Sequence, residues 1–224
     1  MATVLVIGAS RGIGLEFTRQ YSAEGAQVVG TARSDGGLAA VRAAGAEALP
    51  LDVLDEAAVA AFGAQVARRA IDVAIINAGV YGPRVSAVTP PGSAEFDLVM
   101  RTNVRAPMQL MAALAPSVVS ARGRMAIISS RMGSTSLMSS SAGWLYRASK
   151  AAVNAAVKAA SLELGPRGIV CIAFHPGWVR TDMGGADADI DVATSVSGMR
   201  RVLDAANESH NGKFLNYNGE QLSW

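Results

Sequence analysis

The stretch Thr3-Val4-Leu5-Val6-Ile7-Gly8-Ala9-Ser10-Arg11-Gly12-Ile13-Gly14 decides the fold. Its apolar, β-branched first half predicts a buried strand, and a helix is expected to follow over Ile13–Ala23. Glycines in such a turn let the backbone approach a pyrophosphate, and the helix N-terminus supplies amide donors. The spacing is G-x-x-x-G-x-G rather than G-x-G-x-x-G, so a plain tight turn is the alternative interpretation. The candidate dinucleotide-binding residues here are Gly8, Ser10, Arg11, Gly12, Ile13 and Gly14.

The rest of the chain alternates short apolar runs with alanine-rich stretches of helical length. Strands are expected at Gln27–Thr31, Glu47–Leu51, Asp72–Ile76, Arg124–Ser129, Ile169–Phe174 and Lys213–Tyr217. Helices are expected near Leu38–Ala44, Glu56–Arg69, Phe96–Ser120 (bent or tightly packed at Pro107), Tyr146–Leu164 and Val192–Ala206. This alternation predicts one α/β domain over residues 1–224, a Rossmann fold with a doubly wound, mostly parallel seven-stranded sheet covered by helices on both faces.

Composition excludes several classes of protein. Half of the 224 residues are hydrophobic and the net charge is +2, which excludes disorder and does not favour a nucleic-acid partner. One cysteine and two distant histidines predict no disulfide framework and no metal site. No apolar run is long enough for a membrane helix, and the N-terminus lacks the basic region of a signal peptide. A cytoplasmic location without a membrane partner is expected.

A second motif is Tyr146-Arg147-Ala148-Ser149-Lys150. Positions four apart share one face of a helix, so the phenol and the ammonium are expected side by side. A neighbouring ammonium favours the phenolate and should lower the pKa of Tyr146 toward working pH. The pair would then serve a carbonyl or an alcohol as acid and base, and a solvated pair is the alternative.

Other polar segments follow predicted strands: Asn77-Ala78-Gly79, Ser129-Ser130 and His175-Pro176-Gly177-Trp178-Val179-Arg180-Thr181-Asp182. Asn103 lies in the predicted long helix. The carboxyl ends of the strands form the ligand crevice of a doubly wound sheet, so these segments should converge there. His175 is interpreted as a packed loop residue, whereas Trp144 and Trp178 are expected either to wall a substrate or to anchor their loops.

Taken in order, these motifs resemble the short-chain dehydrogenase/reductase family along nearly the whole chain. Within the family the chain looks like the branch of C-factor and sniffer-type carbonyl reductases. The resemblance implies that Tyr146 is the catalytic acid and base and that Lys150 activates it and holds the nicotinamide ribose. It also implies that Ser130 hydrogen-bonds the substrate carbonyl and that Asn103 holds a water in a proton relay.

The assignment of the serine rests on a departure from the family pattern. Ser130 precedes Tyr146 by 16 positions, whereas many family members use 13, a count that lands on Gly133. Ser129 and Ser134 are the competitors. Ser130 is preferred because it lies at a strand end, where the following loop can absorb the insertion.

The predicted second strand suggests the cofactor. NAD selectivity usually needs an acid at the end of this strand, and none occurs before Asp35. Arg33 could instead pair with a 2′-phosphate, and Arg11 could clamp it from the glycine turn. NADP(H) is therefore preferred and NAD(H) remains possible, because both arginines could be solvated and Asp35 could reach the ribose.

The resemblance supplies the remaining cofactor contacts. Asp52 and Val53 would contact the adenine, whereas Asn77, Ala78 and Gly79 would line the cofactor. A last group would form the wall around the nicotinamide: Pro176, Gly177, Val179 and Thr181.

The predicted function is reduction of an aldehyde or ketone to an alcohol, or the reverse, by an NADP(H)-dependent enzyme that assembles as a homodimer or homotetramer. The alternative is a dinucleotide-binding signalling protein of the C-factor type whose activity is incidental. Loss of catalytic residues would favour that alternative, and none of the motif residues is lost.

Overall fold

Seven parallel strands form one sheet in the order β3-β2-β1-β4-β5-β6-β7 in the computed structural model, which describes residues 1–84 and 88–224. The strands are β1 (Thr3–Ile7), β2 (Gln27–Ala32), β3 (Glu47–Pro50), β4 (Val73–Ile76), β5 (Arg124–Ile128), β6 (Val170–His175) and β7 (Lys213–Asn216). All six pairings between named strands are parallel, so the expected doubly wound sheet is confirmed and is parallel throughout.

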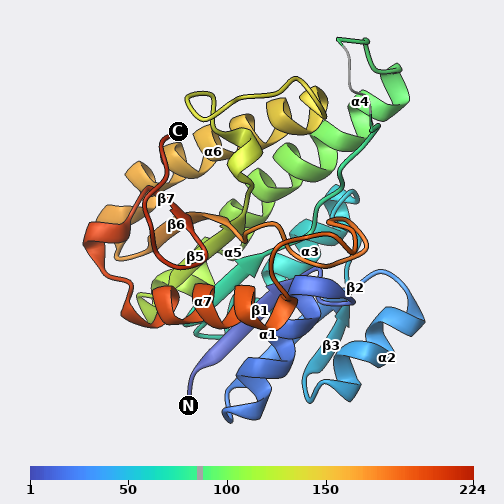
Figure 1. Cartoon of the computed structure of the whole chain (residues 1–224). Coiled ribbons are helices and arrows are strands. Elements are labelled where there is room, and N and C mark those ends of the chain that lie inside the picture. The colour runs from blue at the N-terminus through green and yellow to red at the C-terminus, as the bar shows by residue number, and fades with distance from the viewer. Residues whose placement is uncertain (85–87) are drawn as a thin grey trace.

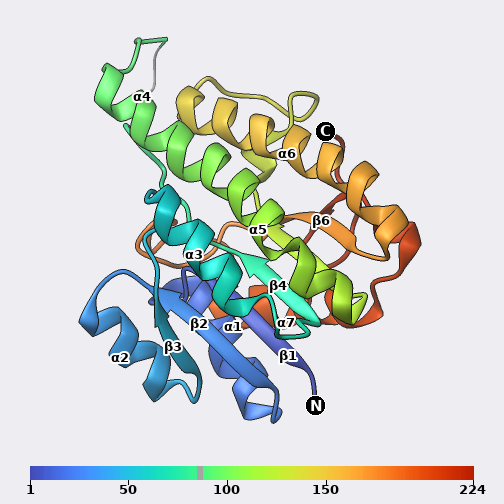
Figure 2. The same cartoon turned by 180° about the vertical axis from the view of Figure 1, so that it is seen from behind.

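Helices cover both faces of the sheet. They are α1 (Gly12–Ala23), α2 (Asp35–Ala43), α3 (Glu56–Val66), α4 (Ser93–Met100), α5 (Ala106–Ala121), α6 (Trp144–Leu164) and α7 (Val192–Ala205). Figure 1 shows α1 and α7 in front of the sheet, and Figure 2 shows α3, α5 and α6 on the opposite side. Among the described helices none is both long and apolar enough to cross a membrane.

The alternation of side chains along β1 explains the two layers. Val4 and Val6 pack in one apolar cluster with Phe17 of α1 and Met199 of α7. Leu5 and Ile7 point the other way, into a cluster with residues of α3, α5 and α6. Successive strand residues face opposite sides of a sheet, so a strand that is apolar throughout requires cover on both faces.

The long helix expected over Phe96–Ser120 is interrupted. Residues Arg101–Arg105 between α4 and α5 form a π-helical segment, which contains Asn103. Pro107 lies in the first turn of α5, directly after this segment. The expected single helix is therefore divided by a π-helical segment before the proline, and the burial of Pro107 agrees with the alternative that the helix is tightly packed there.

The order of the strands reverses between β1 and β4, and this switch point positions the site. The amides of Asn77 and Ala78, just past β4, both donate to the Ile7 carbonyl at 3.0 and 3.1 Å. The Asn77 side chain donates to the Gly8 carbonyl at 2.8 Å. The two strand ends are thus held together where a doubly wound sheet binds its ligands.

Candidate active site

The glycine turn after β1 depends on its glycines. Gly8 and Gly12 have φ values of +83° and +52°, which disfavour a side chain. A Cβ at Gly8 would lie 2.9 Å from the Ala78 amide nitrogen, and one at Gly14 would lie 2.1 Å from the Gly8 carbonyl oxygen. The turn therefore brings the backbone of β1, α1 and the β4 end closer together than any side chain permits.

A cleft of about 370 Å³ opens above this turn at the switch point. It is lined by most of the residues that the sequence assigned to the cofactor or to catalysis. These are Gly8, Ser10, Arg11, Gly12, Ile13, Arg33, Val53, Asn77, Ala78, Gly79, Tyr146, Lys150, Pro176 and Thr181. The backbone turn at the start of α1, the strand ends and the arginines together fit an anionic dinucleotide.

Six predicted site residues do not line this cleft: Gly14, Asp52, Asn103, Ser130, Gly177 and Val179. Gly14 packs against the Gly8 carbonyl and the Asn77 side chain. Val179 is buried, and its carbonyl accepts a hydrogen bond from the Thr181 hydroxyl at 3.3 Å. The exposed Asp52 carboxylate accepts from the Leu54 amide at 3.0 Å. Gly177 lines a different cavity, described below.

The two arginines of the cleft differ in their surroundings. The Arg33 guanidinium has neither an ion pair nor a hydrogen bond to any residue that the structure describes, and it is exposed in the cleft. Arg11 forms an ion pair with Asp182 at 3.0 Å, and both side chains are more than three-quarters exposed. Because such an exposed pair is weak, Arg11 can exchange Asp182 for another anion at little cost.

Tyr146 and Lys150 lie on one face of α6 as expected, but their electrostatics differ from the prediction. Burial raises the pKa of Tyr146 above its ordinary value, against the opposing effect of hydrogen bonding by Ser130. Burial also lowers the pKa of Lys150 to about 8. The Lys150 ammonium donates to the Ile128 carbonyl at 2.8 Å and lies 5.5 Å from the centre of the Tyr146 ring. The expected lowering of the phenol pKa by the ammonium is therefore wrong here, because burial has the largest effect on this pKa and the Lys150 ammonium is not among the groups that shift it.

The three candidate serines have different partners. Ser130 lies within hydrogen-bonding reach of the Tyr146 phenol, and its oxygen also accepts from the Met132 amide at 3.1 Å. Ser129 donates to the Asn154 side chain at 2.5 Å, and Ser134 donates to the Trp224 carbonyl at 3.2 Å. Ser129 lines the cofactor cleft and Ser130 does not, but Ser130 is the one of the three whose hydroxyl acts on the Tyr146 phenol.

Asn103 is held by a closed set of hydrogen bonds. Its side-chain nitrogen donates to the Val80 carbonyl at 2.8 Å and to the Ser149 hydroxyl at 3.0 Å. Its side-chain oxygen accepts from the Val80 amide at 2.9 Å. Both N–H groups of the side chain are thus used to fix the loop after β4 against α6, the helix that carries Tyr146 and Lys150.

Tyr81 is a site residue that the sequence did not reveal. Its ring stacks on the Tyr146 ring, with the ring centres 4.6 Å apart. The Arg84 guanidinium lies 4.6 Å from the Tyr81 ring centre and donates to the Met183 carbonyl at 2.7 Å. Tyr81 therefore helps to keep water from the phenol. A tyrosine four residues after Asn77 gives no signal of this stacking, because the course of an irregular loop is not encoded by periodicity.

The buried lysine should leave a signature in the pH dependence of stability. Between about pH 8 and 10.5 the unfolded chain retains the Lys150 proton that the folded chain has lost, so unfolding takes up a proton. The free energy of unfolding should therefore rise with pH in this window, by up to about 1.4 kcal/mol per pH unit, relative to Lys150→Met. Urea titrations between pH 7.5 and 9.5 measure this difference. Lys158→Met, at an exposed lysine of the same helix, is the control, and equal slopes for the wild type and both variants would contradict the assignment.

Comparisons with known proteins agree with this geometry. Residues 2–191 match the short chain dehydrogenase family. The C-signal protein of Myxococcus xanthus is 39% identical over 168 residues, which cover 73% of this chain and 99% of that protein. Carbonyl reductase Sniffer of D. melanogaster superposes over 100% of both chains with a TM-score of 0.93 at 29% identity. A carbonyl reductase from Pseudomonas aeruginosa PAO1, solved in complex with NADP, covers 100% of both chains with a TM-score of 0.88 at 35% identity.

Proposed function

Because the chain belongs to the short-chain dehydrogenase family, in the branch of C-factor and sniffer-like proteins, we propose that it reduces aldehydes or ketones with NADPH. The observation that carries the proposal is the grouping of Tyr146, Ser130 and Lys150 beside the dinucleotide-sized cleft. Carbonyl reductases among the structural relatives support the same reaction class.

Tyr146 would be the proton donor during reduction. The phenol is protonated at neutral pH and could donate to the carbonyl oxygen as negative charge develops there, while the burial that raises its pKa would have to be offset when the phenolate forms. Ser130, beside the phenol, would hydrogen-bond the same oxygen and stabilise that charge. Lys150 would stabilise the resulting phenolate and hold the ribose hydroxyls. Bound NADPH would supply the hydride to the carbonyl carbon.

Asn103 takes a positioning role in this proposal. Its side chain uses both N–H groups on Val80 and Ser149, so we assign it to fixing the loop after β4 and the helix of Tyr146. The water of the proton relay that the family resemblance implies would then be held by a group other than the Asn103 side-chain N–H groups. Asp52 remains a candidate adenine contact at the edge of the cleft, next to Val53, which lines it.

The surroundings of Arg33 support a preference for NADPH. Asp35 lies in the first turn of α2 and does not line the cleft, whereas Arg33 does. Arg33→Ala should raise the KM for NADPH by about tenfold to a hundredfold, the loss of a charge-assisted hydrogen bond, and change the KM for NADH little. Steady-state kinetics with both cofactors measure this, and Arg42→Ala, on the exposed side of α2, is the control. An equal effect on both cofactors would show that Arg33 does not read the 2′-phosphate.

We also propose assembly into a homodimer or homotetramer. Met108 on α5 and Leu162 on α6 are 53% and 67% exposed, so these neighbouring helices carry apolar surface that a second copy could bury. Sedimentation equilibrium tests the assembly, and a monomer at micromolar concentration would contradict it.

The relative named C-signal favours a second candidate function, a dinucleotide-binding signalling protein with incidental activity. One experiment separates the two. NADPH and NADH oxidation is followed at 340 nm with a panel of aldehydes, ketones, diketones and quinones. NADPH-selective turnover is expected from the reductase. Cofactor binding without turnover of any panel member would support the signalling protein instead.

A further inference from the structure

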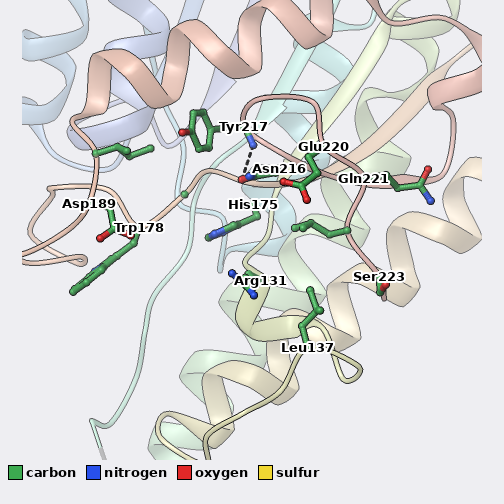
Figure 3. A pocket seen from close by; sticks show the side chains of 13 residues that line it. Arg131, Leu137, His175, Trp178, Asp189, Asn216, Tyr217, Glu220, Gln221 and Ser223 are labelled. Atoms are coloured by element: carbon green, nitrogen blue, oxygen red, sulfur yellow. Dashed lines mark hydrogen bonds between the residues drawn. The ribbon is translucent and has the colours of Figure 1, made fainter.

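A second cavity of about 460 Å³ adjoins the cofactor cleft on the far side of the Pro176–Gly177 backbone. Pro176 lines the cleft and Gly177 lines this cavity, which lies over the carboxyl ends of β6 and β7. Its walls come from the loop after β5, the loop between β6 and α7, and the C-terminal segment (Figure 3). Arg131, which follows Ser130 in the chain, forms one wall, so the cavity begins next to the residues proposed for carbonyl reduction.

The Arg131 side chain has no ion pair and no hydrogen bond to any residue described in the structure. Arg33 of the cofactor cleft is free in the same way, whereas three other arginines around the site are engaged: Arg11 with Asp182, Arg84 with the Met183 carbonyl and Arg180 with the Ala188 carbonyl. An Arg fork binds a carboxylate through two parallel N–H donors. A guanidinium left free at the wall of a cavity is therefore suited to such a ligand.

His175 completes this wall. Figure 3 shows its ring beside the Arg131 guanidinium. Its Nδ1 is buried without a hydrogen-bond partner in the described part of the chain. Burial and the neighbouring Arg131 lower the pKa of His175 to about 4, so the ring is neutral at physiological pH. It can offer a hydrogen bond to a ligand held by Arg131, but it adds no second positive charge.

The charges at the cavity limit the ligand. Asp189 and Glu220 also line it and are exposed to solvent. Because these two carboxylates are negative, the cavity disfavours phosphates and other polyanions, and a ligand would have to place a single negative charge directly on the Arg131 guanidinium. Trp178, Leu137 and Leu222 supply apolar and aromatic surface for the rest of a small organic molecule.

We propose that this cavity binds the carboxylate of the substrate itself, so that the enzyme acts on aldehydes or ketones that carry one carboxylate group. Arg131 is the residue that binds the carboxylate, with His175 as its neighbour. The inference rests on the proposed reductase activity, because the carbonyl must reach Ser130 and Tyr146 while the acid lies beside Arg131.

The test compares two matched aldehydes, 4-carboxybenzaldehyde and methyl 4-formylbenzoate, with NADPH. The wild type should prefer the free acid, and Arg131→Gln should lower the ratio of the two kcat/KM values by about tenfold or more. Arg131→Lys keeps the charge and should recover part of the ratio. Arg68→Gln, at an exposed arginine of the segment after α3, is the control and should leave the ratio unchanged.

The outcomes separate this inference from the proposed function. Turnover of both aldehydes with a ratio that Arg131→Gln does not change would overturn the carboxylate site and leave the reductase. If neither aldehyde is turned over, calorimetric titration with 4-(hydroxymethyl)benzoate decides: binding weakened by Arg131→Gln supports the site, and no binding overturns it. Benzoate that binds without competing against 4-carboxybenzaldehyde would indicate a separate organic acid as the ligand and overturn the assignment to the substrate.

Discussion

Tyr146→Phe should reduce kcat for carbonyl reduction by about a hundredfold to ten-thousandfold, the range supplied by a positioned general acid. Tyr146 is 8% exposed and its hydroxyl lies beside Ser130, so removal of the hydroxyl takes away the proton donor and leaves the cleft walls in place. NADPH affinity should change little, because the benzyl ring remains. Stopped-flow and steady-state measurements at 340 nm, with fluorescence titration of NADPH, check both statements.

Two controls make this result specific. Tyr21→Phe removes a buried phenol of α1 that lines neither the cofactor cleft nor the second cavity, and it should retain most of the kcat. Ser130→Ala should lower kcat by a smaller factor than Tyr146→Phe, because it removes a hydrogen bond to the developing oxyanion and leaves the acid. Full activity of Tyr146→Phe would end the proposed mechanism.

The raised pKa of Tyr146 shows where sequence reasoning reached its limit. The four-residue spacing to Lys150 predicted correctly that both groups share a face of α6. It could not reveal that both are buried, that the ammonium donates to the Ile128 carbonyl, or that Tyr81 stacks on the phenol. These features depend on strand ends and loops far apart in the chain, and they reverse the expected direction of the phenol pKa.

The fold can be predicted from the sequence more completely than the site can, for a physical reason. Apolar runs and alanine-rich stretches encode strands and helices locally, so the parallel order of the sheet follows from alternation. The π-helical segment around Asn103 has no such local signature, since Pro107 alone suggested a bend at a different point. The second cavity was also hidden, because Arg131, His175 and Tyr217 belong to three separate segments that meet only in the folded chain.

Gly14→Ala should destabilise the protein and weaken NADPH binding together. The added Cβ would lie 2.1 Å from the Gly8 carbonyl oxygen and 2.7 Å from the Asn77 side-chain nitrogen, so α1 must move away from the β1 end. Overpacking of this kind costs about 1–3 kcal/mol, and contact with backbone places this site at the upper end. The same movement shifts the α1 amides that face the cleft. Urea unfolding measures the first effect, and NADPH titration measures the second.

Gly36→Ala is the matched control for this substitution. Gly36 lies in the first turn of α2, and a Cβ there meets no atom within 4 Å. The added methyl group should stabilise the helix by about 0.5–1 kcal/mol, since alanine loses less backbone entropy on folding than glycine. If Gly14→Ala lowers the free energy of unfolding and Gly36→Ala raises it, the close approach of α1 to β1, rather than glycine content, maintains the cleft. A Gly14→Ala variant with unchanged stability and NADPH affinity would contradict the assignment of this turn to the cofactor.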